Sequence, residues 1–177
     1  PGDKNYDLFK LACKVSAKRL FPNFSFIDAP FNLQYYKPDD YNTEVAYMGC
    51  RTRVLGNYVD ENKCVTAGRG NLSFTSINLP RLGIKHGIVN NEKTDLKGFY
   101  EELEEKLELV KDQLLERFEI QCNKRINNFP FLLGQGVWLD SEKLKPTDKL
   151  RKIYKHGTLS VGFIGLAECL KALIGEH

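Results

Sequence analysis

The 177-residue chain has few cysteines, and they lack the spacing of metal-binding pairs. An odd number of cysteines without a CxxC motif argues against a tetrathiolate zinc site made by this chain alone, and against a secreted disulfide framework. We therefore expect a cytoplasmic protein from a reducing compartment, with no metal site of its own. The five cysteines are Cys13, Cys50, Cys64, Cys122 and Cys169.

Long apolar runs are also lacking. No stretch of about 18 or more uncharged apolar residues occurs, and charged residues are spread through the first 20 positions. Neither a membrane span nor a signal peptide is expected. Lys and Arg number 26 against 23 Asp and Glu, a net charge of +3. That mild excess suits a polyphosphate ligand but is too small for a nucleic-acid binder, so we expect no nucleic-acid partner.

The length and composition fit one globular unit. Apolar residues make up 42% of the chain, enough to form a core, and we predict a single unit over residues 1–177. Because the chain begins at Pro1 without an initiator methionine and stops just after a helical pattern, we expect it to be a fragment of a longer protein.

The apolar pattern alternates between helical and strand periodicity, which favours an α/β unit with mostly parallel strand pairing. In the 94–124 helix, with Thr94 as its N-cap, the apolar positions indicate either a core face or a seam with a partner helix. The predicted helices cover residues 7–21, 94–124, 148–156 and 166–174, and the predicted strands cover residues 24–28, 72–79 and 158–164.

One cysteine lies in a turn-prone hexapeptide, Met48-Gly49-Cys50-Arg51-Thr52-Arg53. Gly49 permits a tight loop with the thiol at its tip, and the two arginines would favour a thiolate. No histidine forms a recognisable local signature with it, so these residues alone fit a structural Cys50 and a reactive one equally well. Cys13, Cys122 and Cys169 lie in helical apolar patterns and are predicted to be buried, whereas Cys64 is predicted to be exposed or half-exposed.

Polar residues near glycines are candidate ligand contacts. The amide of Asn71, after Gly68-Arg69-Gly70, could bind a ribose hydroxyl or simply serve a turn. Asn78, at the end of a strand, could contact a ligand or cap the backbone. The segment His156-Gly157-Thr158-Leu159-Ser160 and the later Gly162-Phe163-Ile164-Gly165 precede a helix, where exposed amides could hold a triphosphate or serve packing alone.

Three segments in order, GCRTRV, GNLSFTSINLPRLGI and HGTLSVGFIGLAE, together resemble the catalytic core of the class III, anaerobic, glycyl-radical ribonucleoside-triphosphate reductases. The resemblance runs from about Pro22 to the end of the chain. It implies a ten-stranded α/β barrel made of two antiparallel half-sheets, with a finger loop that carries a radical cysteine. This chain would supply part of one half-barrel with the finger, and some of its strands would have exposed edges.

The resemblance also implies the chemistry. Cys50 takes the position of the thiyl radical, which abstracts the 3′-hydrogen of a ribonucleoside triphosphate before the 2′-hydroxyl leaves as water. Met48 would line the pocket beside the sulfur, and Thr52 would orient a substrate or reductant group. The implied substrate-binding residues are Met48, Thr52, Asn71, Asn78, Gly157, Thr158 and Ser160.

Further parts of such an enzyme are expected outside this chain. The glycyl radical and a four-cysteine zinc motif would lie in a C-terminal segment, and a radical-SAM iron–sulfur activating enzyme would generate the radical. Formate is the implied reductant, and the parent enzyme is expected to be a homodimer. The isolated fragment should be inactive. Two alternatives remain open, another glycyl-radical enzyme such as a lyase, and a non-catalytic interaction module built on the 94–124 helix.

Overall fold

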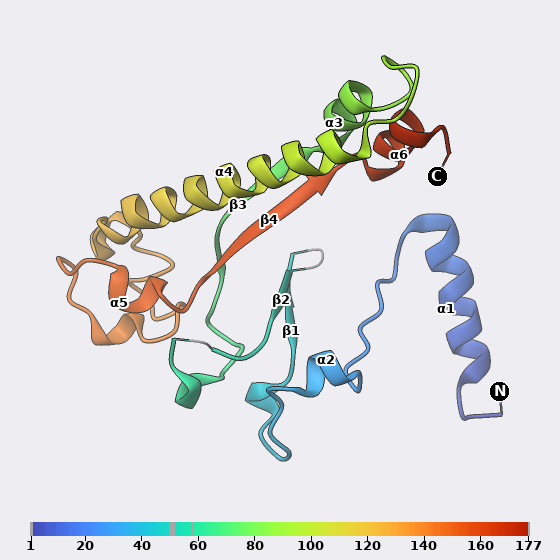
Figure 1. Ribbon diagram of the computed structural model, residues 1–177. Coiled ribbons are helices and arrows are strands. Elements are labelled where there is room, and N and C mark those ends of the chain that lie inside the picture. Colours follow the sequence, from blue (N-terminus) through green and yellow to red (C-terminus); the bar gives the residue numbers. More distant parts are fainter. Residues whose placement is uncertain (1, 50–51, 58, 177) are drawn as a thin grey trace.

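The computed structural model describes residues 2–49, 52–57 and 59–176, whose elements are shown in Figure 1. The α-helices are α1 (Tyr6–Arg19), α2 (Pro30–Leu33), α3 (Leu79–His86), α4 (Leu96–Cys122), α5 (Arg151–Tyr154) and α6 (Leu166–Ile174). The strands are β1 (Ala46–Met48), β2 (Thr52–Val54), β3 (Asn71–Asn78) and β4 (Thr158–Ile164), and short 3-10 helices lie at Tyr41–Thr43, Glu61–Lys63, Ile126–Asn128 and Ser141–Lys143.

Strands β3 and β4 form a parallel pair, although α3, α4 and α5 lie between them in the sequence. Parallel neighbours need a long crossover connection, and these helices supply it. The predicted parallel pairing is confirmed for these two strands. The bounds expected for β4 and α6 match the structure, and β3 is displaced by one residue.

Helix α4 lies along one face of this strand pair (Figure 1). Two hydrogen bonds hold α4 against β3. Thr75 Oγ1 donates to Gln113 Oε1 at 3.0 Å, and Arg117 donates to Ser73 Oγ at 3.2 Å. Because side chains alternate along a strand, Ser73, Thr75 and Ile77 face α4, whereas Phe74 and Ser76 face away.

The first hydrophobic core lies where β3 ends and α3, α4 and α6 meet. Asn78 caps α3, its Oδ1 accepting from Arg81 N at 3.3 Å, and Pro80 occupies the first turn, where a missing N–H costs nothing. Helix α6 packs closely on α3, because a Cβ at Gly83 would lie 2.6 Å from the carbonyl oxygen of Cys169. The buried residues of this core are Ile77, Leu79, Leu82, Phe99, Val110, Leu114, Cys169 and Leu173.

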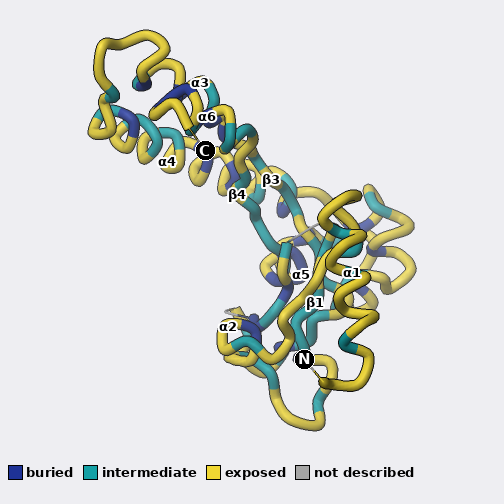
Figure 2. The backbone as a smooth tube through the Cα atoms, turned by 90° about the vertical axis from the view of Figure 1, so that its right-hand side faces the viewer, coloured by how far each residue is buried: buried dark blue, intermediate teal, exposed yellow. Residues whose placement is uncertain are grey.

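A second core lies at the other end of α4, where the chain folds back around α5. Figure 2 shows buried residues both near α3 and α6 and near α5. Trp138 packs against this core, and its ring is tilted by 48° to that of Tyr154, with the ring centroids 5.3 Å apart. Its buried residues are Cys122, Ile126, Leu133, Leu150, Ile153 and Tyr154.

The N-terminal helix contributes to neither core. None of the fourteen described residues of α1 is buried, and Leu8, Leu11 and Leu20 are each more than half exposed. The predicted helix over 7–21 is confirmed, with bounds at Tyr6 and Arg19.

The predicted strand over residues 24–28 is wrong. The segment is irregular, and Phe24, Phe26 and Ile27 are exposed. A strand needs a neighbour to satisfy its backbone, and no described segment pairs with this one. The expected N-cap at Thr94 is also wrong. Asp95 caps α4 by accepting from Gly98 N at 2.9 Å, while Thr94 Oγ1 donates to the carbonyl of Leu173 at 2.6 Å.

Two cysteines differ from expectation. Cys13 is exposed because α1 packs against neither core, and Cys64 is buried because the turn at Glu61–Lys63 directs its thiol to the carbonyl of Glu61, at 3.1 Å. Burial of Cys122 and Cys169 is confirmed, and it raises the pKa of both thiols.

The mixed α/β character is confirmed. Within the described residues the strands form two separate two-stranded sheets, β1 with β2 and β3 with β4. No helix in this part of the chain is both long and apolar enough to cross a bilayer.

Candidate functional site

Strands β1 and β2 form an antiparallel hairpin around the cysteine hexapeptide. Met48 pairs with Thr52 and Ala46 with Val54, so a three-residue loop joins the strands. Gly49 opens this loop with φ +57°, a left-handed conformation that favours glycine. Cys50 and Arg51 lie outside the described residues. The structure thus describes Met48 and Thr52 as a cross-strand pair on either side of the loop that contains the predicted catalytic residue.

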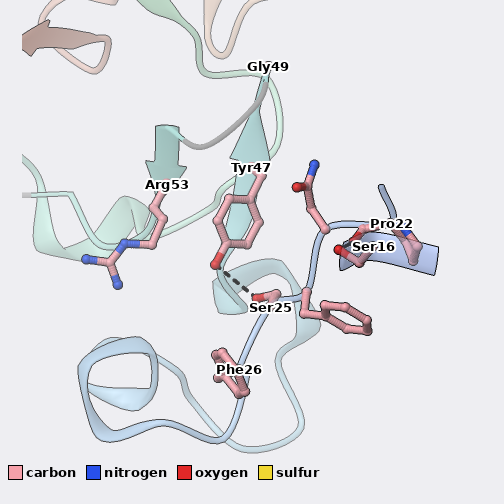
Figure 3. A pocket seen from close by; sticks show the side chains of 9 residues that line it. Ser16, Pro22, Ser25, Phe26, Tyr47, Gly49 and Arg53 are labelled. Carbon is pink, nitrogen blue, oxygen red and sulfur yellow. Dashed lines mark hydrogen bonds between the residues drawn. The ribbon is translucent and has the colours of Figure 1, made fainter. Parts of the chain in front are cut away.

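A cavity of about 630 Å³ lies beside the hairpin (Figure 3). Tyr47, Gly49 and Arg53 line it from the hairpin, and Ser16 and residues 22–26 line it from the N-terminal segment. Ser25 and Tyr47 meet across it through a hydrogen bond of 3.0 Å between their hydroxyl groups. The backbone next to Cys50 therefore borders a space large enough for a small ligand or a peptide segment.

Arg53 pairs with Tyr47 across the hairpin, lines the same cavity, and anchors the hairpin to α2. Its guanidinium donates to Asn32 Oδ1 at 2.8 Å and lies over the ring of Phe31, 5.1 Å from the centroid. Asn32 is buried and in turn donates to the carbonyl of Phe26 at 2.7 Å. Helix α2 is thus the support on which the base of the hairpin rests.

The starts of β3 and β4 bring together three predicted substrate residues. Asn71 pairs with Thr158, and Thr158 N donates to the carbonyl of Gly70 at 2.9 Å. Gly157 precedes this pair and packs against Leu72. Asn71 itself is exposed, so its amide is available to a ligand.

Trp138 supports the backbone before Asn71. A Cβ on Gly70 would lie 2.6 Å from Cζ3 of Trp138, so the indole packs directly on the glycine. Leu139 N donates to the carbonyl of Gly68 at 2.6 Å, and Trp138 Nε1 donates to the carbonyl of Ile153 at 3.3 Å. The sequence analysis missed this contact. The pairing of the only tryptophan with Gly70 is a long-range contact that no local pattern indicates.

Asn78 lies at the far end of β3. It follows Asn71 by seven positions, which corresponds to roughly 23 Å along a strand. Its side chain caps α3, as the alternative interpretation proposed. Asn78 and Ser160 lie on the same face of the strand pair, the one opposite to α4. Asn78 and Phe74 are an even number of residues apart in β3, and Phe74 pairs with Ser160 of β4. The structure therefore does not gather all predicted substrate residues at one point.

A second cavity, of about 410 Å³, lies between the hairpin and the start of β4. Arg53 lines it from β2, residues 55–57 and 59 from the following loop, and residues 155–159 from the segment that enters β4. Two predicted substrate residues, Gly157 and Thr158, line this cavity.

A polar network in the lining of this cavity was not predicted from the sequence. Asn57 Nδ2 donates to His156 Nδ1 at 2.9 Å and to the carbonyl of Lys63 at 3.2 Å. Arg69 donates from Nε to the carbonyl of His156 and from Nη1 to that of Gly56. Burial lowers the pKa of His156, and the nearby Lys155 and Lys63 lower it further, so the imidazole is held neutral.

No group of three or more His, Cys, Asp or Glu side chains within the described ranges is arranged to hold a metal ion. The chemistry available in this part of the chain is the positioning of a loop, amide and hydroxyl hydrogen bonding, and attraction of anions.

A family model described as anaerobic ribonucleoside-triphosphate reductase matches residues 1–177. Proteins named anaerobic ribonucleoside-triphosphate reductase are 30% identical over 177 residues in Haemophilus influenzae and 32% identical over 180 residues in Salmonella typhimurium, in each case covering 99% of this chain and 23% of the relative. A protein of the same name from Enterobacteria phage T4 is 28% identical over 176 residues, which cover 98% of this chain and 27% of the relative. The chain spans about a quarter of the length of these relatives.

Proposed function

This chain belongs to the family of anaerobic ribonucleoside-triphosphate reductases, and we propose that it supplies part of the active-site wall of an enzyme that converts ribonucleoside triphosphates to 2′-deoxyribonucleoside triphosphates. Cys50 is the residue that reacts with substrate. The supporting observation is the cross-strand pair of Met48 and Thr52, which closes a three-residue hairpin loop around position 50.

In the proposed reaction, the sulfur of Cys50, as a thiyl radical, takes the 3′-hydrogen atom of the ribose. The 2′-hydroxyl then leaves with a proton as water. Formate supplies two electrons and is released as carbon dioxide, so that one triphosphate, one formate and one proton give one deoxynucleotide, one carbon dioxide and one water. A glycyl radical, carried outside this chain, would supply the oxidation of the thiol.

Residues on either side of Cys50 would protect and orient this chemistry. The thioether of Met48 has no hydrogen-bond donor and would form an apolar wall. The hydroxyl of Thr52 would orient a substrate or reductant group. Gly49 lines a cavity of about 630 Å³, which gives another segment of the parent protein room to approach position 50.

Substrate contacts are assigned to the strand pair. Asn71 is exposed at the start of β3, beside Gly157 and Thr158, and would bind a ribose hydroxyl. Ser160 and Asn78 share the strand face away from α4 and would contact the substrate along that face. In the parent enzyme, we propose that β3 and β4 join further strands in half of a ten-stranded barrel, with the β1–β2 hairpin as its finger.

The parent enzyme would be a homodimer activated by a radical-SAM iron–sulfur protein, with its zinc site outside this chain. Of the alternatives, the interaction module has the weaker support, because α4 buries Phe99, Val110 and Leu114 in the core of this chain. Another glycyl-radical enzyme has less support than the reductase, because the matched relatives carry the reductase name.

The proposal is tested with the full-length parent protein, activated under anaerobic conditions and supplied with formate. We expect deoxynucleotide formation from a ribonucleoside triphosphate and carbon dioxide in a one-to-one ratio. Turnover of small acids or alcohols without any turnover of nucleotides would replace the reductase with the lyase alternative.

A further inference from the structure

The cavity of about 410 Å³ between the hairpin and the start of β4 has walls of one charge sign. Its charged lining residues are Arg53, Arg69 and Lys155, and none of the described residues that line it is acidic. His156 also lines it, but its Nδ1 accepts from Asn57 and burial lowers its pKa. The formal charge of the lining is therefore +3 near neutral pH.

These three cations have no ion-pair partner, whereas eight other basic residues of the described chain do. Lys63 and Lys143 both pair with Asp140, and Lys85 pairs with Glu102. Among the described residues, by contrast, no carboxylate forms an ion pair with Arg53, Arg69 or Lys155. Cations that converge on a cavity without counter-charges repel one another, and this repulsion is relieved when an anion enters.

Arg69 is the most informative of the three because it is partly buried. Two of its five N–H groups bind the carbonyls of His156 and Gly56, which fixes the guanidinium at the cavity wall. Burial lowers its pKa. A desolvated cation that is fixed by neutral carbonyls and has no carboxylate partner is unfavourable by itself and is a good receptor for an anion.

We propose that this cavity is a binding site for an oligophosphate, held by the lining cations Arg53, Arg69 and Lys155. A charge of +3 matches several phosphate groups better than a single carboxylate, and arginine binds phosphate through two parallel hydrogen bonds. Leu55, Val59 and Leu159 form apolar walls of the same cavity that would accept an uncharged part of the ligand. Only the assignment of this oligophosphate to a nucleoside triphosphate rests on the proposed function.

Binding of inorganic tripolyphosphate to the 177-residue chain, measured by isothermal titration calorimetry, tests the proposal without any need for turnover. Lys155 is exposed, and its side chain forms no hydrogen bond or ion pair with the described residues, so K155M should fold normally. We expect this variant to weaken binding about tenfold, the effect of losing one charge-assisted contact. K152M is the matched control, because Lys152 is an exposed lysine of α5, three residues before Lys155, and does not line the cavity. It should bind like wild type.

Two further titrations identify the ligand. Citrate, a trivalent carboxylate, should bind at least tenfold more weakly than tripolyphosphate, and a ribonucleoside triphosphate should displace tripolyphosphate from wild type. Absence of tripolyphosphate binding, equal losses in K155M and K152M, or equal affinity for citrate would each overturn the site. If tripolyphosphate binds normally but a ribonucleoside triphosphate does not displace it, the cavity binds a free oligophosphate and not a nucleotide. That result would leave the reductase proposal unchanged.

Discussion

Asn57 Nδ2 donates a hydrogen bond of 2.9 Å to His156 Nδ1, and this contact fixes both the amide orientation and the imidazole tautomer. The amide cannot be reversed, because Asn57 Oδ1 already accepts from the backbone N–H groups of Val59 and Asp60, at 3.1 and 3.3 Å. The proton of neutral His156 therefore resides on Nε2. This pair joins the loop after the hairpin to the segment that enters β4.

Replacing this asparagine should destabilise the chain. N57A removes a buried amide and leaves His156 Nδ1, a carbonyl and two backbone N–H groups without their partner. We expect the free energy of unfolding in urea to fall by about 2–4 kcal/mol. N62A, in the same loop but exposed, should change it by no more than about 0.5 kcal/mol. Equal effects of the two variants would show that the amide network contributes little.

Stability should depend on the protonation of His156. Its pKa is lowered from 6.5 in the folded chain, so the unfolded chain binds more protons between 6.5 and the folded pKa. Stability is therefore fully present above pH 6.5 and falls as the pH is lowered through that window. The free energy of unfolding, measured between pH 8 and 5, should decline less steeply in H156Q than in wild type. If the free energy of unfolding falls equally steeply with pH in both proteins, His156 is not the group responsible for the pH dependence.

Asp140 should make the stability of the fold depend on pH in a separate, more acidic range. It bridges Lys143 and Lys63, which lower its pKa from 3.8 to about 2. A carboxylate with a lowered pKa stabilises the fold above its unfolded pKa, and this contribution is lost as the pH falls through 3.8 toward about 2. D140N should be less stable than wild type at pH 7, with a difference that shrinks as the pH is lowered. Asparagine tolerates the left-handed backbone at this position, φ +64°, and E142Q, beside it, is the control.

The contact between Gly70 and Trp138 should appear as an energetic coupling. G70A places a methyl group 2.6 Å from the indole and should cost about 1–3 kcal/mol of unfolding free energy through overpacking. In a W138L background the same change should cost at least about 1 kcal/mol less, because the opposing ring is gone. A double-mutant cycle in urea measures this coupling. Additive losses would mean that the ring does not restrict position 70.

The elements with strong periodic patterns were predictable from sequence, and the long-range contacts were not. Strand β4 and helix α6 have the expected bounds because an apolar run and a helical pattern meet at Gly165, which takes φ +69°. Segment 24–28 has an equally apolar sequence but no described strand to pair with. The exposure of Cys13 and the burial of Cys64 were also not predictable from local sequence, because burial depends on what an element packs against.

The candidate site was predictable in part. The hexapeptide indicated a tight loop, and the structure describes Met48 and Thr52 as its closing pair. The network of Asn57, His156 and Arg69 was not foreseen, because its members lie far apart in the sequence and meet only when the chain folds.

The role of Cys50 in the chemistry is the central claim, and C50A in the activated full-length parent protein tests it most directly, with C13A as the control because Cys13 is exposed. The glycyl radical is followed by electron paramagnetic resonance, and deoxynucleotide formation is measured in the same samples. We predict that C50A retains the radical signal and forms no deoxynucleotide, while C13A keeps both. Deoxynucleotide formation by C50A would contradict the account and would withdraw the roles proposed for Met48 and Thr52.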